Sequence, residues 1–322
     1  MKTYDNKKIQ MFSTIGSRAT FGIVAYDLAK DVENLMILTA DVSTSAGLDR
    51  YRKKYSEKYL DVGIAEQNMI GIAAGLSSEG FNVITTTFAP FQTMRCLEQI
   101  KVNLGYMKNK VIMVGLASGI VLGSLGYTHC SIEDLSIMRS IPNITVISPA
   151  DCLETAKSIE SAINHEQSVY IRLTGSSNSP CVYKEDYDFK IGKVVNILNG
   201  EDVVILATGT MVYNSIEAAN ILKNYNIFPA IVNVHTLNHI DKDEIKKITN
   251  NAKIVFTLEE HSIIGGLSSF YSELRSSEDI TSRHISIALP NNYNISGEYE
   301  YLKALNLLTP EKIANRIKNE LR

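Results

Sequence analysis

The sequence GIAEQNMIGIAAGLSSEG contains the residue best suited to proton chemistry, the carboxyl group of Glu66. Mostly apolar residues follow from Met69 to Leu76 and occupy most sides of a helical wheel. They predict a helix that begins near Glu66, is buried nearly all round and ends near Gly80. Glu66 is either a capping acid stabilised by the helix dipole or a buried acid held for proton chemistry. The periodicity of the sequence is compatible with both roles.

Other side chains that could form a site lie where predicted strands end. Asp41 follows the apolar run LMILTA, and the aromatic residues Phe88 and Phe91 follow VITTT. A glycine-punctuated loop leads to His129, and Arg172 lies near the end of the run SVYIRL. Ligands of parallel α/β sheets bind at the carboxyl ends of the strands, so we expect these residues near one site.

The alternation of strand-like and helix-like segments predicts two doubly wound α/β domains, at residues 1–180 and 190–322. A polar segment at 175–192 is the expected linker. In the first domain we expect strands at 35–40, 83–88, 111–117, 144–148 and 168–173. Besides the Glu66 helix, we expect helices there at 17–30, 91–106, 132–140 and 151–164. In the second we expect strands at 203–208, 230–234, 254–258 and 285–288, and helices at 214–223, 241–248, 266–273 and 310–320.

Composition excludes several classes of protein. A formal net charge of -3 over 322 residues leaves no basic footprint for nucleic acid and no polybasic membrane segment. No apolar run approaches the ~18–20 residues that a membrane helix requires. The four cysteines are scattered without CxxC spacing, which argues against a zinc site or a disulfide framework. We expect a cytoplasmic protein with reduced thiols.

Three blocks, GIAEQNMIGIAAGLSSEG, TFAPFQTMR and GYTHCSIEDLSIMRSIPNITVISPAD, resemble the transketolase family of thiamine diphosphate enzymes in order and spacing. The resemblance continues weakly to the C-terminus. It implies a pyrimidine-binding, thiamine diphosphate-fold domain followed by a smaller transketolase C-terminal-like domain. The family's matching glutamate, which corresponds to Glu66, hydrogen-bonds the cofactor's aminopyrimidine ring and so activates the thiazolium carbon.

The resemblance also assigns roles to other residues. Phe88 and Phe91 match aromatic residues that pack on the pyrimidine, and Met94 replaces a third aromatic residue. His129 matches a histidine that holds or protonates substrate oxygens. Glu133 matches an acid that is either functional or only a brace for the loop, and Asp41 matches an acid near the cofactor and a subunit contact. Arg172 matches an arginine that binds a substrate phosphate, and its alternative role is a surface charge at the end of a strand. His261 is expected to be structural or interfacial.

One departure from the family bears on the substrate. Sugar transketolases usually carry an aspartate four residues before the matching histidine, where it binds a hydroxyl group of the donor. Here that residue is Leu125, and Cys130 replaces the glutamine that usually follows the histidine. The apolar Leu125 cannot accept a hydrogen bond, which favours a donor that is less hydroxylated or differently oriented.

The GDG motif that begins the family's diphosphate-binding domain does not occur in this sequence. The resemblance therefore implies the C-terminal subunit of a split transketolase, active only with an N-terminal subunit and assembled as a heterotetramer. That partner would bind most of the diphosphate and its Mg²⁺ or Ca²⁺ ion. The expected reaction transfers a two-carbon ketol unit from a ketose or ketose phosphate to an aldehyde.

Three alternatives remain open at this stage. A deoxyxylulose-phosphate synthase-like enzyme would use a 2-oxoacid donor, which tolerates Leu125. A 2-oxoacid dehydrogenase decarboxylase beta subunit has similar length and domain order, but the EDLSIMRSIPN block argues against it. A non-catalytic regulatory paralogue belongs to a different class, and the presence of Glu66, both phenylalanines and His129 argues against that hypothesis.

Overall fold

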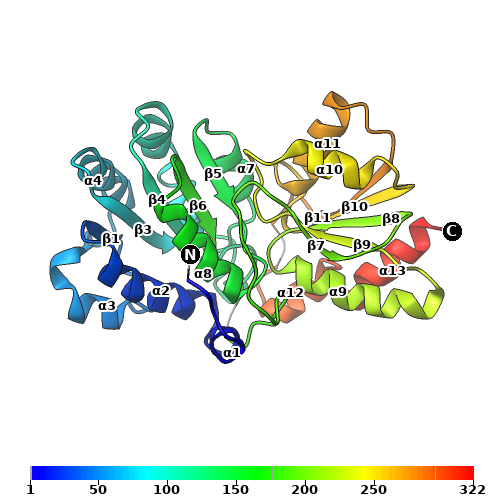
Figure 1. Cartoon of the computed structure of the whole chain (residues 1–322), viewed down its shortest axis with the longest axis horizontal. Coiled ribbons are helices and arrows are strands. Elements are labelled where there is room, and N and C mark those ends of the chain that lie inside the picture. Colours follow the sequence, from blue (N-terminus) through cyan, green and yellow to red (C-terminus); the bar gives the residue numbers. More distant parts are fainter. Residues whose placement is uncertain (1, 176, 294) are drawn as a thin grey trace.

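The computed structural model describes residues 2–175, 177–293 and 295–322 and contains two α/β domains that lie side by side (Figure 1). The first sheet has six parallel strands, in the order β2 (Tyr59–Asp61), β1 (Leu35–Thr39), β3 (Asn82–Phe88), β4 (Val111–Leu116), β6 (Ser168–Arg172) and β5 (Ile144–Ile147). Its long strands are almost wholly buried, as expected for parallel strands covered on both faces.

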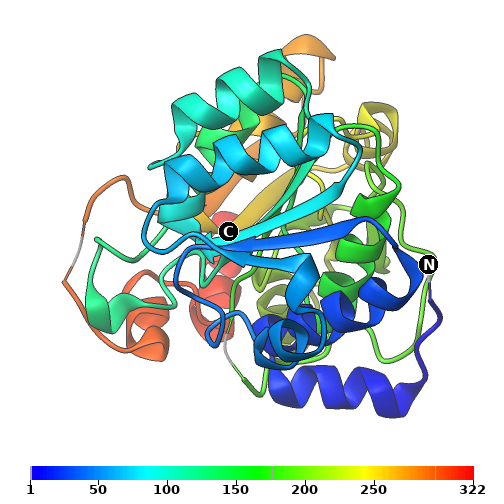
Figure 2. The same ribbon diagram turned by 90° about the vertical axis from the view of Figure 1, so that its left-hand side faces the viewer.

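Helices cover both faces of the first sheet, as Figure 2 shows. The helices α1 (Asn6–Ile15), α2 (Ser17–Asp31) and α8 (Cys152–Ile163) share one apolar cluster with the sheet. The opposite face packs against α4 (Glu66–Ser78), the π-helical segment η2 (Ile100–Tyr106) and α7 (Asp134–Arg139). Two short helices, α3 (Asp49–Lys54) and α5 (Ala89–Gln92), lie in the connections that follow β1 and β3.

The second sheet has the order β11 (Arg283–Leu289), β10 (Ile254–Ser262), β8 (Val203–Ala207), β9 (Ala230–Asn233) and β7 (Val195–Leu198), of which β7 is antiparallel. Its helices are α9 (Met211–Leu222), α10 (Lys242–Thr249), α11 (Leu267–Ser277), α12 (Tyr299–Leu305) and α13 (Pro310–Glu320). The prediction of two α/β domains is confirmed.

The two domains meet along the edge of the first sheet. The amide of Ser148, just after β5, donates to the carbonyl of His235 at 2.8 Å, and the amide of Leu237 donates to the carbonyl of Val146 at 3.0 Å. This pairing covers a sheet edge that would otherwise expose unpaired backbone groups. The predicted linker is also anchored, because Asp151 accepts hydrogen bonds from the amides of Val182 and Tyr183.

The structure corrects three expectations. A continuous helix over 91–106 was wrong, because that segment is divided into the end of α5, the short α6 (Leu97–Gln99) and η2. The strands β2 and β7 and the helices α1 and α12 were not predicted. The helix α4 is not buried all round, because Asn68, Gly71 and Gly75 form an exposed stripe.

Candidate active site

Glu66 is the first residue of α4 and is only 3% exposed. Its Oε1 accepts a hydrogen bond from Nη1 of Arg95 at 2.7 Å, and the two side chains form an ion pair. None of the described side chains caps this helix, and the carboxylate, in the first turn, is stabilised by the positive end of the helix dipole. Burial with a charged partner fits an acid held in place better than an exposed capping acid.

Two phenylalanines lie next to this acid. The guanidinium carbon of Arg95 lies 4.0 Å from the centroid of the Phe91 ring, a close cation–π contact. The rings of Phe88 and Phe91 pack edge to face at 6.4 Å. The thiol of Cys96 donates to the carbonyl oxygen of Phe91 at 3.1 Å, and burial raises the pKa of that thiol to about 12, which keeps the donor protonated.

His129 joins the cluster from the loop that follows β4. Its ring lies 5.5 Å from that of Phe91 in an edge-on arrangement. Its Nδ1 lies 3.0 Å from Oγ1 of Thr128, and the ring is half-buried. The structure therefore brings together Glu66, both phenylalanines and His129, which are far apart in the sequence.

An open pocket of about 490 Å³ adjoins this cluster. It is lined by Phe91, Met94, Arg95, Tyr127 and, from the second domain, Tyr293, among others. Met94 is 50% exposed and so is available at the surface of the pocket.

Asp61 is a residue that sequence reasoning missed. Its carboxylate accepts from the amides of Gly63 at 2.9 Å and Asp41 at 3.0 Å, and from the hydroxyl of Thr39. Partial burial opposes its ionisation, but these hydrogen bonds prevail and lower its pKa. Asp61 thereby ties the end of β1 to the turn that leads into Glu66. Its position just before the GIAEQ block was the available signal.

Two other predicted residues lie at the surface. Asp41 is exposed and adopts a left-handed backbone conformation, with φ 57°, at the end of β1. Leu125 is 57% exposed and lies in the loop that carries His129. In the described structure, neither side chain makes a contact that indicates which ligand it would bind.

Arg172 is not a surface charge at the end of a strand, which was one of the two roles expected for it. It is 2% exposed, and its Nε donates to Asp134 at 2.8 Å in a fully buried ion pair. Its two other nitrogens donate to Thr174 and to the carbonyls of Ser131 and Glu260. Through these partners Arg172 links the first domain to β10 of the second, and none of them belongs to the Glu66 cluster. Its binding of a substrate phosphate stays a prediction.

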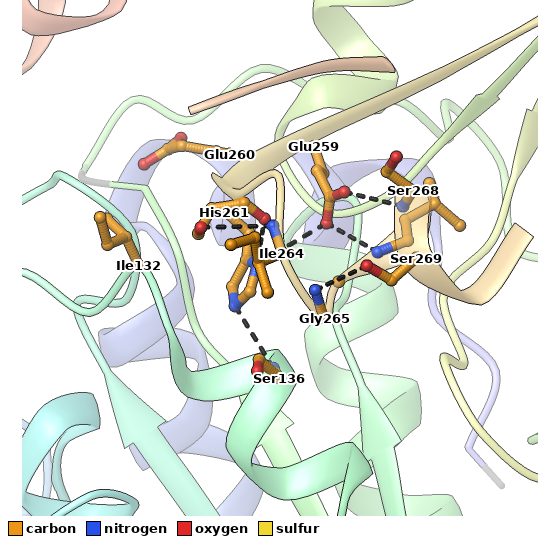
Figure 3. A network of polar contacts seen from close by, with 12 residues as sticks. Ile132, Ser136, Glu259, Glu260, His261, Ile264, Gly265, Ser268 and Ser269 are labelled. Carbon is orange, nitrogen blue, oxygen red and sulfur yellow. Dashed lines mark hydrogen bonds and ion pairs between the residues drawn. The ribbon is translucent and has the colours of Figure 1, made fainter. Parts of the chain in front are cut away.

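His261 lies in a buried polar network between the domains, which Figure 3 shows. Its Nε2 accepts from the amide of Ser136 at 3.3 Å, and burial lowers its pKa to about 4, so the ring is neutral near pH 7. Beside it, Glu259 accepts from the amides of Leu267 and Ser268 at the start of α11. These contacts agree with the structural role expected of His261.

In the described part of the chain, no group of three or more His, Cys, Asp or Glu side chains is arranged to hold a metal ion. None of the helices described there has the length and apolar character needed to cross a membrane.

Comparison with known proteins assigns the family. Residues 13–178 match the transketolase pyrimidine-binding domain, and residues 192–313 match the transketolase C-terminal domain. The chain therefore belongs to the transketolase family. It corresponds to the C-terminal subunit of split transketolases, and the family's transferase chemistry depends on thiamine diphosphate.

Individual relatives agree with this assignment. One subunit of the apulose-4-phosphate transketolase of Phocaeicola vulgatus is 32% identical over 85% of this chain and 88% of its own length. A split-gene transketolase solved as an inactive β4 tetramer is 31% identical, with a TM-score of 0.85 over 95% of this chain and 97% of that one. The 1-deoxy-D-xylulose-5-phosphate synthase of Dictyoglomus thermophilum is 31% identical over 97% of this chain but only 49% of its own length.

Proposed function

We propose that this chain supplies the pyrimidine side of a thiamine diphosphate site that a separate subunit completes. The observation that carries the proposal is the position of Arg95. Its guanidinium, a planar cation, lies over the ring of Phe91 and donates to the buried carboxylate of Glu66. A planar nitrogen heterocycle requires the same two partners, an aromatic face and a hydrogen-bonding carboxyl group. The residues present therefore fit the aminopyrimidine of the cofactor.

In this proposal Arg95 is a stand-in that leaves when the cofactor binds. Its side chain is 41% exposed, whereas that of Glu66 is only 4% exposed. The arginine can therefore swing into solvent at small cost, while Glu66 stays fixed at the start of α4. Partly exposed ion pairs contribute about 0.2–1 kcal/mol, so displacement of this one is a modest penalty.

Each residue of the cluster has a defined task. The bound cofactor supplies a nucleophilic carbon and an electron sink for cleavage of a bond next to a carbonyl group. Glu66 would hold the cofactor's ring nitrogen by a hydrogen bond and share a proton with it, and its side chain is only 4% exposed, which limits competition from water. Phe88 and Phe91 hold the plane of the ring, with Met94 at the pocket surface. His129 donates a hydrogen bond to a substrate oxygen.

The exposed stripe of α4 is evidence for a partner subunit that binds next to this site. A Cβ atom added to Gly71 or Gly75 would meet nothing within 4 Å, so a second backbone can approach closely there. Next to the start of the helix, Ile64 is 76% exposed. We assign this surface to the subunit that carries the diphosphate-binding domain and the Mg²⁺ or Ca²⁺ ion. The inactive β4 tetramer formed by a relative is consistent with a chain that self-associates and needs this partner for activity.

The leading donor class is a ketose or ketose phosphate, from which a two-carbon ketol unit passes to an aldehyde. A relative named for a ketose phosphate, apulose 4-phosphate, supports this choice. The match to a deoxyxylulose-phosphate synthase and the presence of Leu125 keep a 2-oxoacid donor as the second candidate.

A donor panel tests the proposal. The chain is mixed with its diphosphate-binding partner, thiamine diphosphate and Mg²⁺, and given ketose phosphates, hydroxypyruvate or pyruvate with an aldehyde acceptor. We expect Glu66→Gln to reduce kcat at least about 100-fold with every donor used. Glu79→Gln, at the exposed far end of α4, is the matched control. Full activity of the Glu66 variant would remove Glu66 from its proposed role.

A further inference from the structure

The loop that carries His129 is held mainly by the second domain. The two ends of the loop are joined at Gly119 and Ser131, whose amides and carbonyls exchange two hydrogen bonds of 2.9 Å. Between these residues the chain forms one short 3-10 turn, Gly123–Leu125. Turn hydrogen bonds fix the local shape of the loop, among them those from the amides of His129 at 3.0 Å and Cys130 at 3.2 Å to the carbonyl of Gly126. These bonds do not attach the loop to the rest of the molecule, so its position depends on its neighbours.

The two ends of the loop are attached to Glu260 and Ser262, which lie two residues apart in β10. At the entry, the amide of Ile120 donates to Oε1 of Glu260 at 2.9 Å. At the exit, the amide of Ser262 donates to the carbonyl of Ile132 at 2.8 Å. Glu260 is 2% exposed, and its Oε2 accepts from the hydroxyls of Thr210 at 3.0 Å and Tyr299 at 2.6 Å. Figure 3 shows Glu260 and Ile132 at this junction.

The middle of the loop is fitted against the connection between β11 and α12. The amide of Gly297 donates to the carbonyl of Gly123 at 3.1 Å. A Cβ atom on Gly123 would lie 2.1 Å from Cδ1 of Leu302 and 2.7 Å from the carbonyl oxygen of Gly297. This approach leaves no room for a side chain, so the two segments are in direct backbone contact.

The far part of the loop contacts Tyr293, which belongs to the same connection. The ring of Tyr293 lies 5.0 Å from that of Tyr127, two residues before His129. Its hydroxyl donates to Oε1 of Glu133 at 2.9 Å, and Oε2 of Glu133 accepts from the amide of Ile132. Tyr293 also lines the same pocket as Phe91 and Met94. It therefore reaches the candidate active site from the other domain.

We infer that the C-terminal domain is part of the active-site framework, with Glu260 and Tyr293 as positioning residues for His129. The inference rests on the proposed role of His129. It extends that proposal, because it makes the second domain necessary for catalytic geometry and not only for assembly.

Tyr293 is the better residue to test, because it is 69% exposed and its replacement leaves the buried core unchanged. Hydrogen exchange of the full chain, followed by mass spectrometry, reports on the loop without any partner or cofactor. In Tyr293→Ala the amides of residues 120–130 should exchange about tenfold faster, the combined effect of a lost aromatic pair and a lost hydrogen bond. Tyr293→Phe retains the ring and should show a smaller increase.

The control is Tyr225→Ala, which removes a tyrosine of the same domain that is 52% exposed and packs under Lys318 of α13. It should leave the loop unchanged. In the reconstituted enzyme, Tyr293→Ala should lower kcat about tenfold while the KM of the donor changes less than about twofold. Exchange in 120–130 that is unchanged, or no faster than in the Tyr225 variant, would overturn the inference.

The two proposals can fail separately. If Tyr293→Ala accelerates exchange in the loop but His129→Gln retains full activity, the anchoring is supported and the proposed role of His129 is refuted. If His129→Gln is inactive while Tyr293→Ala leaves both exchange and kcat unchanged, the proposed function survives and Tyr293 is not a positioning residue.

Discussion

Nη1 of Arg95 lies 2.7 Å from Oε1 of Glu66, and the same guanidinium lies 4.0 Å from the centre of the Phe91 ring. The acid is buried and the base is partly exposed. A partly exposed cation therefore occupies both features that we propose for recognition of the cofactor ring, and of the two charged groups only the cation is free to leave.

This relationship predicts that removing the side chain of Arg95 favours cofactor binding. In Arg95→Ala no ion pair has to be broken, so the Kd for thiamine diphosphate in the assembled enzyme should fall by up to about fivefold. The fall can be measured by calorimetric titration. The control is Arg52→Ala, which removes an arginine of similar exposure, 45%, that pairs with Asp49. Weaker binding by Arg95→Ala would mean that Arg95 supports Glu66 instead of occupying its site.

The exposed stripe of α4 predicts a variant that folds normally but does not assemble. A Cβ atom added at Gly71 meets none of the described residues within 4 Å, and Gly71→Leu replaces a poor helix former, so the free chain should gain roughly 0.5–1 kcal/mol in stability. The larger side chain should block the partner backbone and abolish co-purification of the two subunits. Lys312→Leu, on the exposed face of α13, is the control. Normal assembly of the Gly71 variant would place the partner elsewhere.

The buried pair between Arg172 and Asp134 predicts a large effect on stability. Arg172→Ala leaves a buried carboxylate without its counter-ion and should cost about 3–5 kcal/mol in the free energy of unfolding in urea. Arg316→Ala, which removes the exposed arginine of a partly exposed pair with Glu320, should cost at most about 1 kcal/mol. If the Arg172 variant is equally stable and only the KM of a phosphorylated substrate rises, Arg172 has the substrate role instead.

The raised pKa of Glu259 predicts a specific pH dependence of the free energy of unfolding. Burial raises its pKa from the usual value near 4.5 to about 7, although the amides of Ser268 and Leu267 favour the charged form. Because the folded state holds this proton more tightly, the stabilisation is complete below pH 4.5 and is lost as the pH rises through 7. The whole shift corresponds to roughly 3 kcal/mol.

Comparison of Glu259→Gln with the parent chain isolates this effect. The variant should be at its greatest disadvantage at pH 5 and recover relative to the parent chain by pH 8, as measured by urea unfolding at several pH values. A difference in stability that is the same at every pH would show that Glu259 does not titrate in this range.

The layered architecture could be predicted from the sequence alone, because each buried parallel strand appears there as a short, continuous run of apolar residues. The predicted strand at 111–117 and the observed β4, Val111–Leu116, differ by one residue. The strands β2 and β7 were missed because three or four residues at a sheet edge carry little periodic signal. In both cases the pairing partner defines the strand more than its own sequence does.

The residues of the candidate site could be predicted from the sequence only where they lie in the family motifs. Glu66, Phe88, Phe91 and His129 converge as the order of strands implied. The expected helix over 91–106 is interrupted at Thr93, where φ is -107° and ψ is -78°, and beyond this break Arg95 pairs with Glu66. The burial of Arg172 depends on Asp134, 38 residues away, a pairing that no local pattern encodes.

The most direct test of the account is a calorimetric titration of thiamine diphosphate and Mg²⁺ into this chain alone, the diphosphate-binding subunit alone, and an equimolar mixture. We predict strong binding only in the mixture, and its loss or marked weakening when the mixture contains Glu66→Gln. Tight binding to this chain alone would contradict a site divided between two polypeptides.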